Sequence, residues 1–266
     1  NPRNVVLAGR GTAQYIKKGR YKYLPYTKLF ERTDIMKVLE AGEFEGYANR
    51  DSLAYIEAYG LENIPTLYRG TLRRKGYAEA WNVFVQLGMT DDSFRLENSE
   101  NISNRDFINM FLPYNTNMSV EEKICKQFNL TSDSVIFQKI LWLGMFEDTI
   151  ISLENASPAQ LLQAILEQKW TLDSEDKDMI VMQHQFEFLL DGSHNKLNSS
   201  LLVFGEDPRC TAMAKTVGLP VAIAAKLILN GEIQSVGVRI PISKDIYVPV
   251  LKELAENGIN FIEELV

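Results

Sequence analysis

Residue types that commonly carry metal and nucleophile chemistry are scarce in this sequence. The 266 residues include two cysteines and two histidines. Cys125 and Cys210 match no metal-binding spacing and give no disulfide framework, which favours a reducing compartment and a cytoplasmic location. A zinc site or a Ser-His-Asp triad would have to use His184 or His194, and neither has the neighbours for it. We predict no metal site, and the catalytic residues stay unknown.

Long apolar runs are also scarce. No stretch approaches the roughly 20 apolar residues that a membrane helix needs, so we expect no membrane partner. No signal-peptide pattern follows the first residue, Asn1. Because the chain begins with Asn rather than Met, we expect it to be a piece of something longer. The composition, 45% hydrophobic and 24% charged, is ordinary for a globular protein.

The charge is divided unevenly along the chain. Residues 1–75 hold 14 lysines and arginines against 8 aspartates and glutamates, a net of +6, whereas the whole chain carries −7. A basic segment of this kind can bind nucleic acid or a small polyanion, or it can be a solvated positive face. Because the remaining residues are strongly acidic and would repel phosphate, we expect no nucleic-acid partner.

The stretch NVVLAGRGTAQ near the start looks like a strand that enters a glycine-rich turn. A dinucleotide-binding loop needs the pattern G-x-G-x-x-G, and Gln14 stands at the third glycine position. We therefore interpret Gly9 and Gly11 as turn residues between a core strand, 5–8, and a short helix. No cofactor-binding residue is predicted in this chain.

Apolar periodicity and turn residues predict alternating short strands and helices. Residues 89–118 are expected to form a loop, and Trp142, Met145, Phe146 and Trp170 are expected to pack in a core. The predicted strands are 5–8, 44–47, 66–69, 179–188, 199–204 and 237–242, with a turn at Asp191-Gly192 between the fourth and the fifth. The predicted helices are 52–59, 77–87, 119–128, 134–143, one beginning after Ser157, 211–229 in two pieces around Gly218 and Pro220, and 246–257.

Four segments in a fixed order resemble the saccharopine dehydrogenase (saccharopine reductase) family. They are GYANRDSLAYIEAYG at 46–60, TLYRGTLRRKGYAEAWNVFVQLGM at 66–89, DKDMIVMQHQF at 176–186, and TAMAKTVGLPVAIAAKLILNGEI at 211–233 with the ending SKDIYVPVLKELAENGI. The stretch from about 90 to 170 matches the family in layout alone. The joint agreement of the segments is more specific than any one of them.

The resemblance implies an α+β fold, in which a mixed β-sheet substrate-binding domain carries an inserted small helical domain. The C-terminal helices would complete a Rossmann domain that this chain lacks, so the chain is expected to be a C-terminal part of a family member or half of a split enzyme. The implied division is 1–75 and 176–206 for the substrate-binding sheet, 76–175 for the helical domain, and 207–266 for the segment that packs on the nucleotide domain.

The resemblance also implies an activity and a site. Family members are NAD(P)-dependent oxidoreductases of lysine metabolism that transfer a hydride at a C–N bond between 2-aminoadipate semialdehyde, glutamate or lysine and saccharopine. Saccharopine carries three carboxylates, for which planar guanidinium groups are suitable partners. By resemblance, substrate carboxylates would be held by Arg50 and by the segment Thr71, Leu72 and Arg73. NAD or NADP would be bound mainly by the absent domain, and the chain alone is expected to be inactive.

Two departures and several alternatives qualify this interpretation. Arg74 stands where the family usually has an aromatic residue, which adds a charge and removes an expected pocket wall, and Cys210 stands where a small residue is common. A related polyamine enzyme, of the carboxynorspermidine or homospermidine synthase type, and a non-catalytic binding module stay open. So do the choice between NAD and NADP, the direction of the reaction, and the oligomeric state, for which a homodimer is one alternative.

Overall fold

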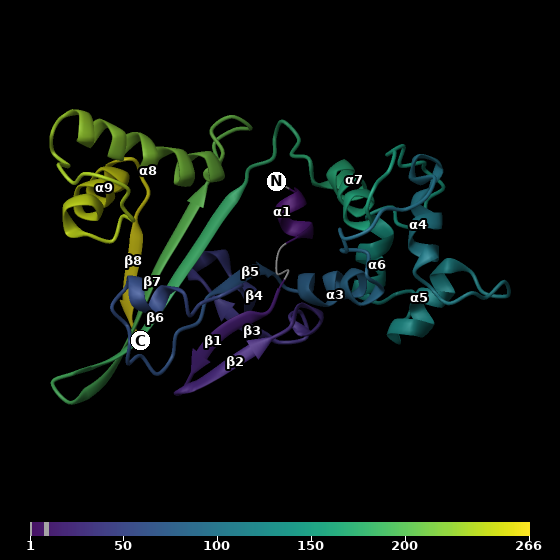
Figure 1. The fold of residues 1–266 in the computed structure, drawn as a ribbon, viewed down its shortest axis with the longest axis horizontal. Coiled ribbons are helices and arrows are strands. Elements are labelled where there is room, and N and C mark those ends of the chain that lie inside the picture. Colours follow the sequence, from purple (N-terminus) through teal and green to yellow (C-terminus); the bar gives the residue numbers. More distant parts are fainter. Residues whose placement is uncertain (1, 8–10) are drawn as a thin grey trace. The chain divides into compact units, whose positions relative to one another are not determined.

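The structure is a computed structural model that describes residues 2–7 and 11–266. Its contacts divide the chain into two compact units, and each is described by itself. The first contains Asn1–Met36 and Phe44–Thr171, and the second contains Lys37–Glu43 and Leu172–Val266. Both helices and strands are present, so the fold is of the mixed kind that was expected (Figure 1). The four-part domain division stays a prediction.

Small antiparallel sheets form the first half of unit 1. Strands β1 (Ala13–Lys17) and β2 (Arg20–Leu24) make a hairpin. Its two-residue turn, Lys18-Gly19, has φ of 52° and 73°, the positive angles of a type I′ turn, whose twist suits paired strands. A second sheet has the order β3-β4-β5. Its strands are Thr33–Lys37, Glu43–Ala48 and Gly70–Arg74.

Helices form the second half of unit 1 and share a continuous apolar core with its sheets. This core includes Val6 and Tyr47 from the first part of the unit and Ile165 and Leu166 from its last helix. Each of these four residues is at most 2% exposed. Capping boxes at Ser119 and Ser157 begin two of the helices, as their sequences predict. The helical elements of the unit are α1 (Pro2–Val6), η1 (Tyr26–Lys28), α2 (Tyr55–Ala58), α3 (Tyr77–Leu87), η3 (Ser99–Asn101), α4 (Asn104–Met110), α5 (Val120–Phe128), α6 (Val135–Trp142) and α7 (Pro158–Trp170).

Unit 2 is built on a long hairpin of β6 (Met179–Leu190) and β7 (Ser193–Phe204), which turns at Asp191-Gly192 as predicted. Strand β8 (Phe261–Leu265) pairs with β7, and η2 (Leu39–Ala41) also contacts β7. Helices α8 (Ala212–Leu229) and α9 (Lys244–Glu256) lie at one end of the hairpin, and its turn lies at the opposite end (Figure 1). Leu201 and Val203 pack there on Ile223, Leu227 and Leu254.

The prediction for the opening stretch was wrong. Residues 5 and 6 belong to helix α1, and Gly11 (φ 91°) is followed by strand β1, not by a helix. Val6 is buried and α1 contacts α7, so the apolar residues serve a helical core. A run this short fits either element, and Pro2 at the first helical position favours the helix. Residues 8–10 of the predicted strand and turn lie outside the described residues.

Other predictions need correction for similar reasons. The strand expected at 66–69 begins at Gly70, and the expected strand at 237–242 is not regular structure. Residues 89–118 contain helix α4, which begins at the N-cap Ser103. Helix α8 is one helix with Pro220 inside it. Trp142 is 57% exposed with Lys169 near its ring face, whereas Met145 and Phe146 are buried.

The expectation that no apolar stretch approaches the length of a membrane helix was wrong for helix α8, which is long and apolar enough to cross a membrane, judged by length and composition alone. A single helix of this kind is weak evidence for a membrane span, because core helices can have the same composition. In unit 2 its residues Ala212, Ile223 and Leu227 pack into the core. The expectation of no membrane partner therefore stays a prediction.

The start of α8 depends on a glycine. The Asp178 carboxylate accepts hydrogen bonds from the backbone N–H groups of Ala212 (2.6 Å) and Met213 (2.9 Å), which satisfies free donors at the helix N-terminus. A Cβ at Gly205 would lie 2.2 Å from Asp178 Oδ1 and 3.1 Å from the Ala212 nitrogen. A side chain at position 205 would therefore displace this cap.

We predict that Gly205→Ala lowers the free energy of unfolding by about 1–3 kcal/mol, because the new methyl group overpacks the cap. The matched control is Gly218→Ala inside α8, where no atom lies within 4 Å of the added Cβ. That change should stabilise the chain by about 0.5–1 kcal/mol. Urea unfolding followed by circular dichroism measures both, and equal effects of the two changes would contradict the role of Gly205.

Candidate functional site

The pairing of β4 with β5 decides which predicted residues share a face. Tyr47 lies opposite Thr71, and Glu45 lies opposite Arg73. Since side chains alternate between the faces of a strand, Thr71 and Arg73 share one face with Tyr47 and Glu45. Leu72 lies on the other face, where its Cδ2 atom would be 3.3 Å from a Cβ at Gly46. Of the predicted segment, Thr71 and Arg73 are thus brought together and Leu72 is not.

Arg73 has neutral partners around its guanidinium. Its Cζ atom lies 5.4 Å from the centre of the Tyr77 ring, which belongs to the first turn of α3. The hydroxyl groups of Tyr47 and Tyr77 lie close enough to Arg73 for its guanidinium to lower their pKa, and Thr71 acts on the pKa of Tyr47 in the same direction. Nη1 contacts the Leu72 carbonyl at 3.4 Å. Within the described ranges, no carboxylate forms an ion pair with Arg73.

The two tyrosines remain uncharged. Burial raises the pKa of the Tyr47 and Tyr77 hydroxyls above the ordinary value, although the nearby Arg73 acts in the opposite direction. Uncharged hydroxyls can accept hydrogen bonds from a guanidinium without cancelling its charge. Arg73 is therefore a cation that forms no ion pair with any carboxylate in the described part of the chain.

Glu45, the carboxylate across from Arg73, is committed to a structural task. It is 6% exposed and accepts hydrogen bonds from the backbone N–H groups of Gly76 (2.6 Å) and Ala78 (3.1 Å). These groups stand at the N-terminus of α3, where a negative charge is favoured by the free donors and the helix dipole. Glu45 thus attaches helix α3, and with it Tyr77, to the strand that carries Tyr47.

Arg50 lies in the loop that follows β4 and is exposed. Its backbone has the left-handed φ of 47°, and its carbonyl accepts a hydrogen bond from the Gln14 N–H at 2.9 Å. The adjacent Asp51 accepts from the Leu53 N–H at 2.8 Å and begins the turn into α2. Asp51 therefore caps locally, while Arg50 makes no ion pair in the part of the chain that is described.

Of the two residues that flank the Thr71-Leu72-Arg73 segment, Arg74 behaves differently from expectation and Gly70 contacts the adjacent strand. Arg74, where an aromatic residue was expected, lies on the opposite face from Arg73 with its Cζ atom 4.6 Å from the centre of the Phe44 ring. It therefore adds no charge beside Arg73. Gly70 does allow a close approach, since a Cβ there would lie 3.2 Å from the Tyr47 carbonyl, but the approaching group is the neighbouring strand.

Tyr47 and Tyr77 were not predicted as site residues. The alternation in EFEGYA and GTLRR could have placed Tyr47 beside Thr71, because facing residues of two paired strands have the same period. Tyr77 could not be found this way, since its position depends on how α3 returns to the sheet. In the structure, the position of α3 against the sheet is set by the hydrogen bonds between Glu45 and the start of the helix.

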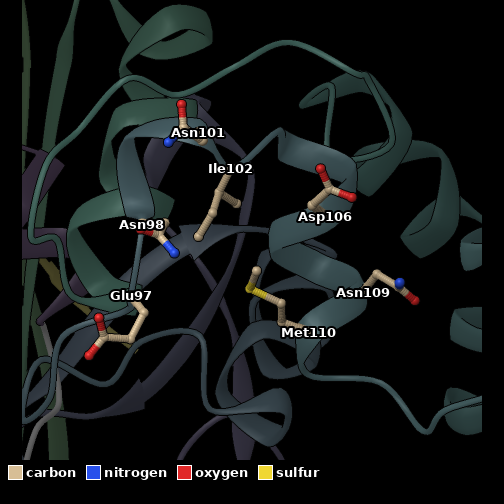
Figure 2. Close-up of a pocket in the computed structure, with 7 residues that line it drawn as sticks. All are labelled: Glu97, Asn98, Asn101, Ile102, Asp106, Asn109 and Met110. Carbon is tan, nitrogen blue, oxygen red and sulfur yellow. The ribbon is translucent and has the colours of Figure 1, made fainter.

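The helical part of unit 1 has a separate hollow of about 430 Å³ (Figure 2). Two carboxylates, Glu97 and Asp106, and three asparagines dominate its lining, and it contains none of the predicted site residues. Asp106 is also engaged in capping α4 through Ser103. An acidic hollow is unsuited to a ligand with several carboxylates, because like charges repel. The residues that line it are Glu97, Asn98, Asn101, Ile102, Asp106, Asn109 and Met110.

Neither metal ligands nor reactive thiols gather at the site. In residues 2–7 and 11–266, no group of three or more His, Cys, Asp and Glu side chains is placed to hold a metal ion. Burial raises the pKa of the Cys125 thiol, which disfavours the reactive thiolate. His184 lies in strand β6 and packs on the rings of Phe186 and Phe261, as a strand residue was expected to.

Known proteins resemble this chain over nearly its whole length. Alpha-aminoadipic semialdehyde synthase from Bos taurus is 36% identical over 235 residues, which cover 82% of this chain and 24% of the relative. Saccharopine dehydrogenase [NADP(+), L-glutamate-forming] from Saccharomyces cerevisiae is 30% identical over 96% of this chain and 58% of the relative. The chain therefore spans from about a quarter to three fifths of the length of these relatives.

The fold agrees with a solved structure of the same group. The apo structure of saccharopine dehydrogenase (L-Glu forming) from Saccharomyces cerevisiae superposes with a TM-score of 0.86 and 30% identity. The match covers 99% of this chain and 61% of that one. The model of the saccharopine dehydrogenase C-terminal domain family matches residues 1–259. This chain belongs to the saccharopine dehydrogenase C-terminal domain family.

Proposed function

We propose that this chain is the substrate-binding part of an NAD(P)-dependent saccharopine dehydrogenase of lysine metabolism. The observation that carries the proposal is Arg73, a half-buried guanidinium that has uncharged hydroxyl partners and no carboxylate partner among the described residues. Such a cation is suited to a substrate carboxylate, which can accept two parallel hydrogen bonds from the planar group. The names of the relatives, which include an NADP(+)-dependent, L-glutamate-forming enzyme, agree with this ligand class.

Arg50 and Thr71 would complete the site. Arg50 is exposed and free of ion pairs in the described residues, so its charge is available to a second carboxylate. Thr71 carries a hydroxyl on the same face as Arg73. Its partner in the sheet, Tyr47, lies two residues closer to the C-terminal end of β4 than the partner of Arg73. If these residues hold the carboxylates of saccharopine, its secondary amine is also fixed in orientation. Fixing the reacting group is the main contribution that such residues make to hydride transfer. Leu72 lies on the opposite face, so its part in binding would come through its backbone.

The nicotinamide nucleotide would supply the hydride acceptor or donor at the C–N bond. The described residues do not fit its binding. Gly11 leads into strand β1 rather than into the N-terminus of a helix, where a pyrophosphate is usually held. The curated relatives are also longer than this chain. We propose that the nucleotide is bound mainly by a domain outside these 266 residues, and that the inserted helical domain and the C-terminal helices have the roles implied by the resemblance.

The surroundings of Arg73 disfavour the polyamine alternative. A polyamine-derived substrate carries several positive charges and needs carboxylates at its binding site. The one carboxylate opposite Arg73, Glu45, is buried and occupied by two backbone N–H groups. A ligand with several carboxylates fits this face better than a polycation does.

We expect Arg73→Ala to weaken the binding of saccharopine by about 10- to 100-fold, since a charge-assisted hydrogen bond is worth about 1.5–3 kcal/mol. Arg50→Ala should weaken it by a smaller factor, because an exposed charge is screened by solvent. Isothermal titration of the chain with saccharopine measures both. Arg20→Ala, at the exposed β1–β2 turn, is the matched control and should leave the affinity unchanged. Unchanged affinity in Arg73→Ala would refute the proposed site.

The chain alone should show no turnover of saccharopine with NADP⁺ or NAD⁺, because the nucleotide-binding residues are proposed to lie elsewhere. Formation of the reduced nucleotide, followed by its absorbance, tests this. The positive control is the full-length saccharopine dehydrogenase of Saccharomyces cerevisiae, assayed under the same conditions. Measurable turnover by residues 1–266 would contradict the proposed division of roles.

A further inference from the structure

The tyrosines beside Arg73 are held rigidly by the core. Tyr47 is 2% exposed, and its ring lies 4.8 Å from that of Phe30. The Tyr77 ring stacks on Trp81 at 5.7 Å with an interplanar angle of 9°. Trp81 packs in turn on Trp170 at 6.3 Å. Rings fixed in this way present their hydroxyl groups at constant positions, so they can restrict a flexible arginine.

Arg73 would otherwise be free to move or to find an anion. An arginine side chain has several rotatable bonds and loses considerable entropy when it is fixed. Proteins often fix an arginine with a carboxylate, but that partner would neutralise the charge that a ligand needs. Here the interactions come from two hydroxyl groups, one ring face and a backbone carbonyl, none of which is charged. The arrangement orients the guanidinium without pairing it with a carboxylate.

We infer that Tyr47 and Tyr77 are positioning residues, which orient Arg73 through uncharged hydroxyl groups so that its full charge meets one carboxylate of a small amino-acid ligand. The inference rests on the proposed function for the identity of the ligand. The geometry behind the inference is independent of the proposed function, because it consists of contacts between Arg73 and other residues of the chain. The Tyr77 ring also lies beside the guanidinium, with its centre 5.4 Å from the Cζ atom of Arg73.

The test is Tyr77→Phe and Tyr47→Phe in the ¹⁵N-labelled chain, with two separate measurements. The first is the rate at which the Arg73 Nε hydrogen exchanges with water in the absence of ligand. We expect it to rise about 10-fold in each variant, since each loses one polar hydroxyl group beside a charged group. The second is the dissociation constant for saccharopine, which should rise by a similar factor. Tyr77→Leu, which also removes the ring, should have the larger effect on both.

The matched control is Tyr59→Phe. Tyr59 is 55% exposed and stacks on Tyr55 at 5.9 Å, so the change removes a hydroxyl from another stacked ring that is not beside Arg73. Both measurements should stay at the wild-type value, and the thermal midpoint of Tyr77→Phe should match that of the control. This comparison separates loss of positioning from general destabilisation.

The outcomes also separate this inference from the proposed function. Unchanged exchange and unchanged affinity in both Tyr→Phe variants would overturn the inference, even where Arg73→Ala abolishes binding and the proposed function stands. Faster exchange of the Arg73 hydrogen with no binding of saccharopine by the wild-type chain would support the positioning role and overturn its link to this ligand. If Tyr47→Phe fails to fold, the same two measurements on Tyr77→Phe test the inference, because Tyr77 is partly exposed.

Discussion

The contact between the Glu45 carboxylate and the start of helix α3 is the constraint on which the candidate site depends. It satisfies two backbone N–H groups that would otherwise be free at the helix terminus, and it does so from the neighbouring strand. The helix is thereby fixed to the sheet, and its first residue, Tyr77, is brought over Arg73. A buried charge that is fully hydrogen-bonded is a firm attachment, because its release would leave the charge unsatisfied.

The same contact explains why Arg73 forms no ion pair with the carboxylate opposite it. Glu45 is the residue directly opposite Arg73 in the sheet, where an acid and a base would ordinarily pair. Since α3 occupies that carboxylate, the groups left near the guanidinium are hydroxyls, a ring and a carbonyl. The acidic hollow between η3 and α4 has the opposite character, with two carboxylates in its lining. The distribution of charge, more than the size of a cavity, favours the Arg73 face for a ligand with several carboxylates.

The sequence predicts those parts of the fold that depend on local signals. The capping serines of α5 and α7, the glycine after α3 and the Asp191-Gly192 turn all specify their elements through neighbouring residues, and the structure confirms them. Predictions that depend on tertiary packing were less successful. A short apolar run became helix α1, which packs on α7. Helix α8 continues through Pro220, with Ala212 before it and Ile223 and Leu227 after it packed in the core of unit 2. At the site, Thr71 and Arg73 could be named from their motif, whereas Tyr77 could not, since nothing near it in the sequence predicts that Glu45 caps its helix.

The central claim is that Arg73, held by uncharged partners, is the principal carboxylate anchor of the site. A crystal structure of saccharopine bound to the protein that contains this chain tests it most directly. The account predicts a carboxylate at hydrogen-bonding distance, about 2.7–2.9 Å, from the Arg73 guanidinium. Saccharopine bound with all three carboxylates away from Arg73 would contradict it.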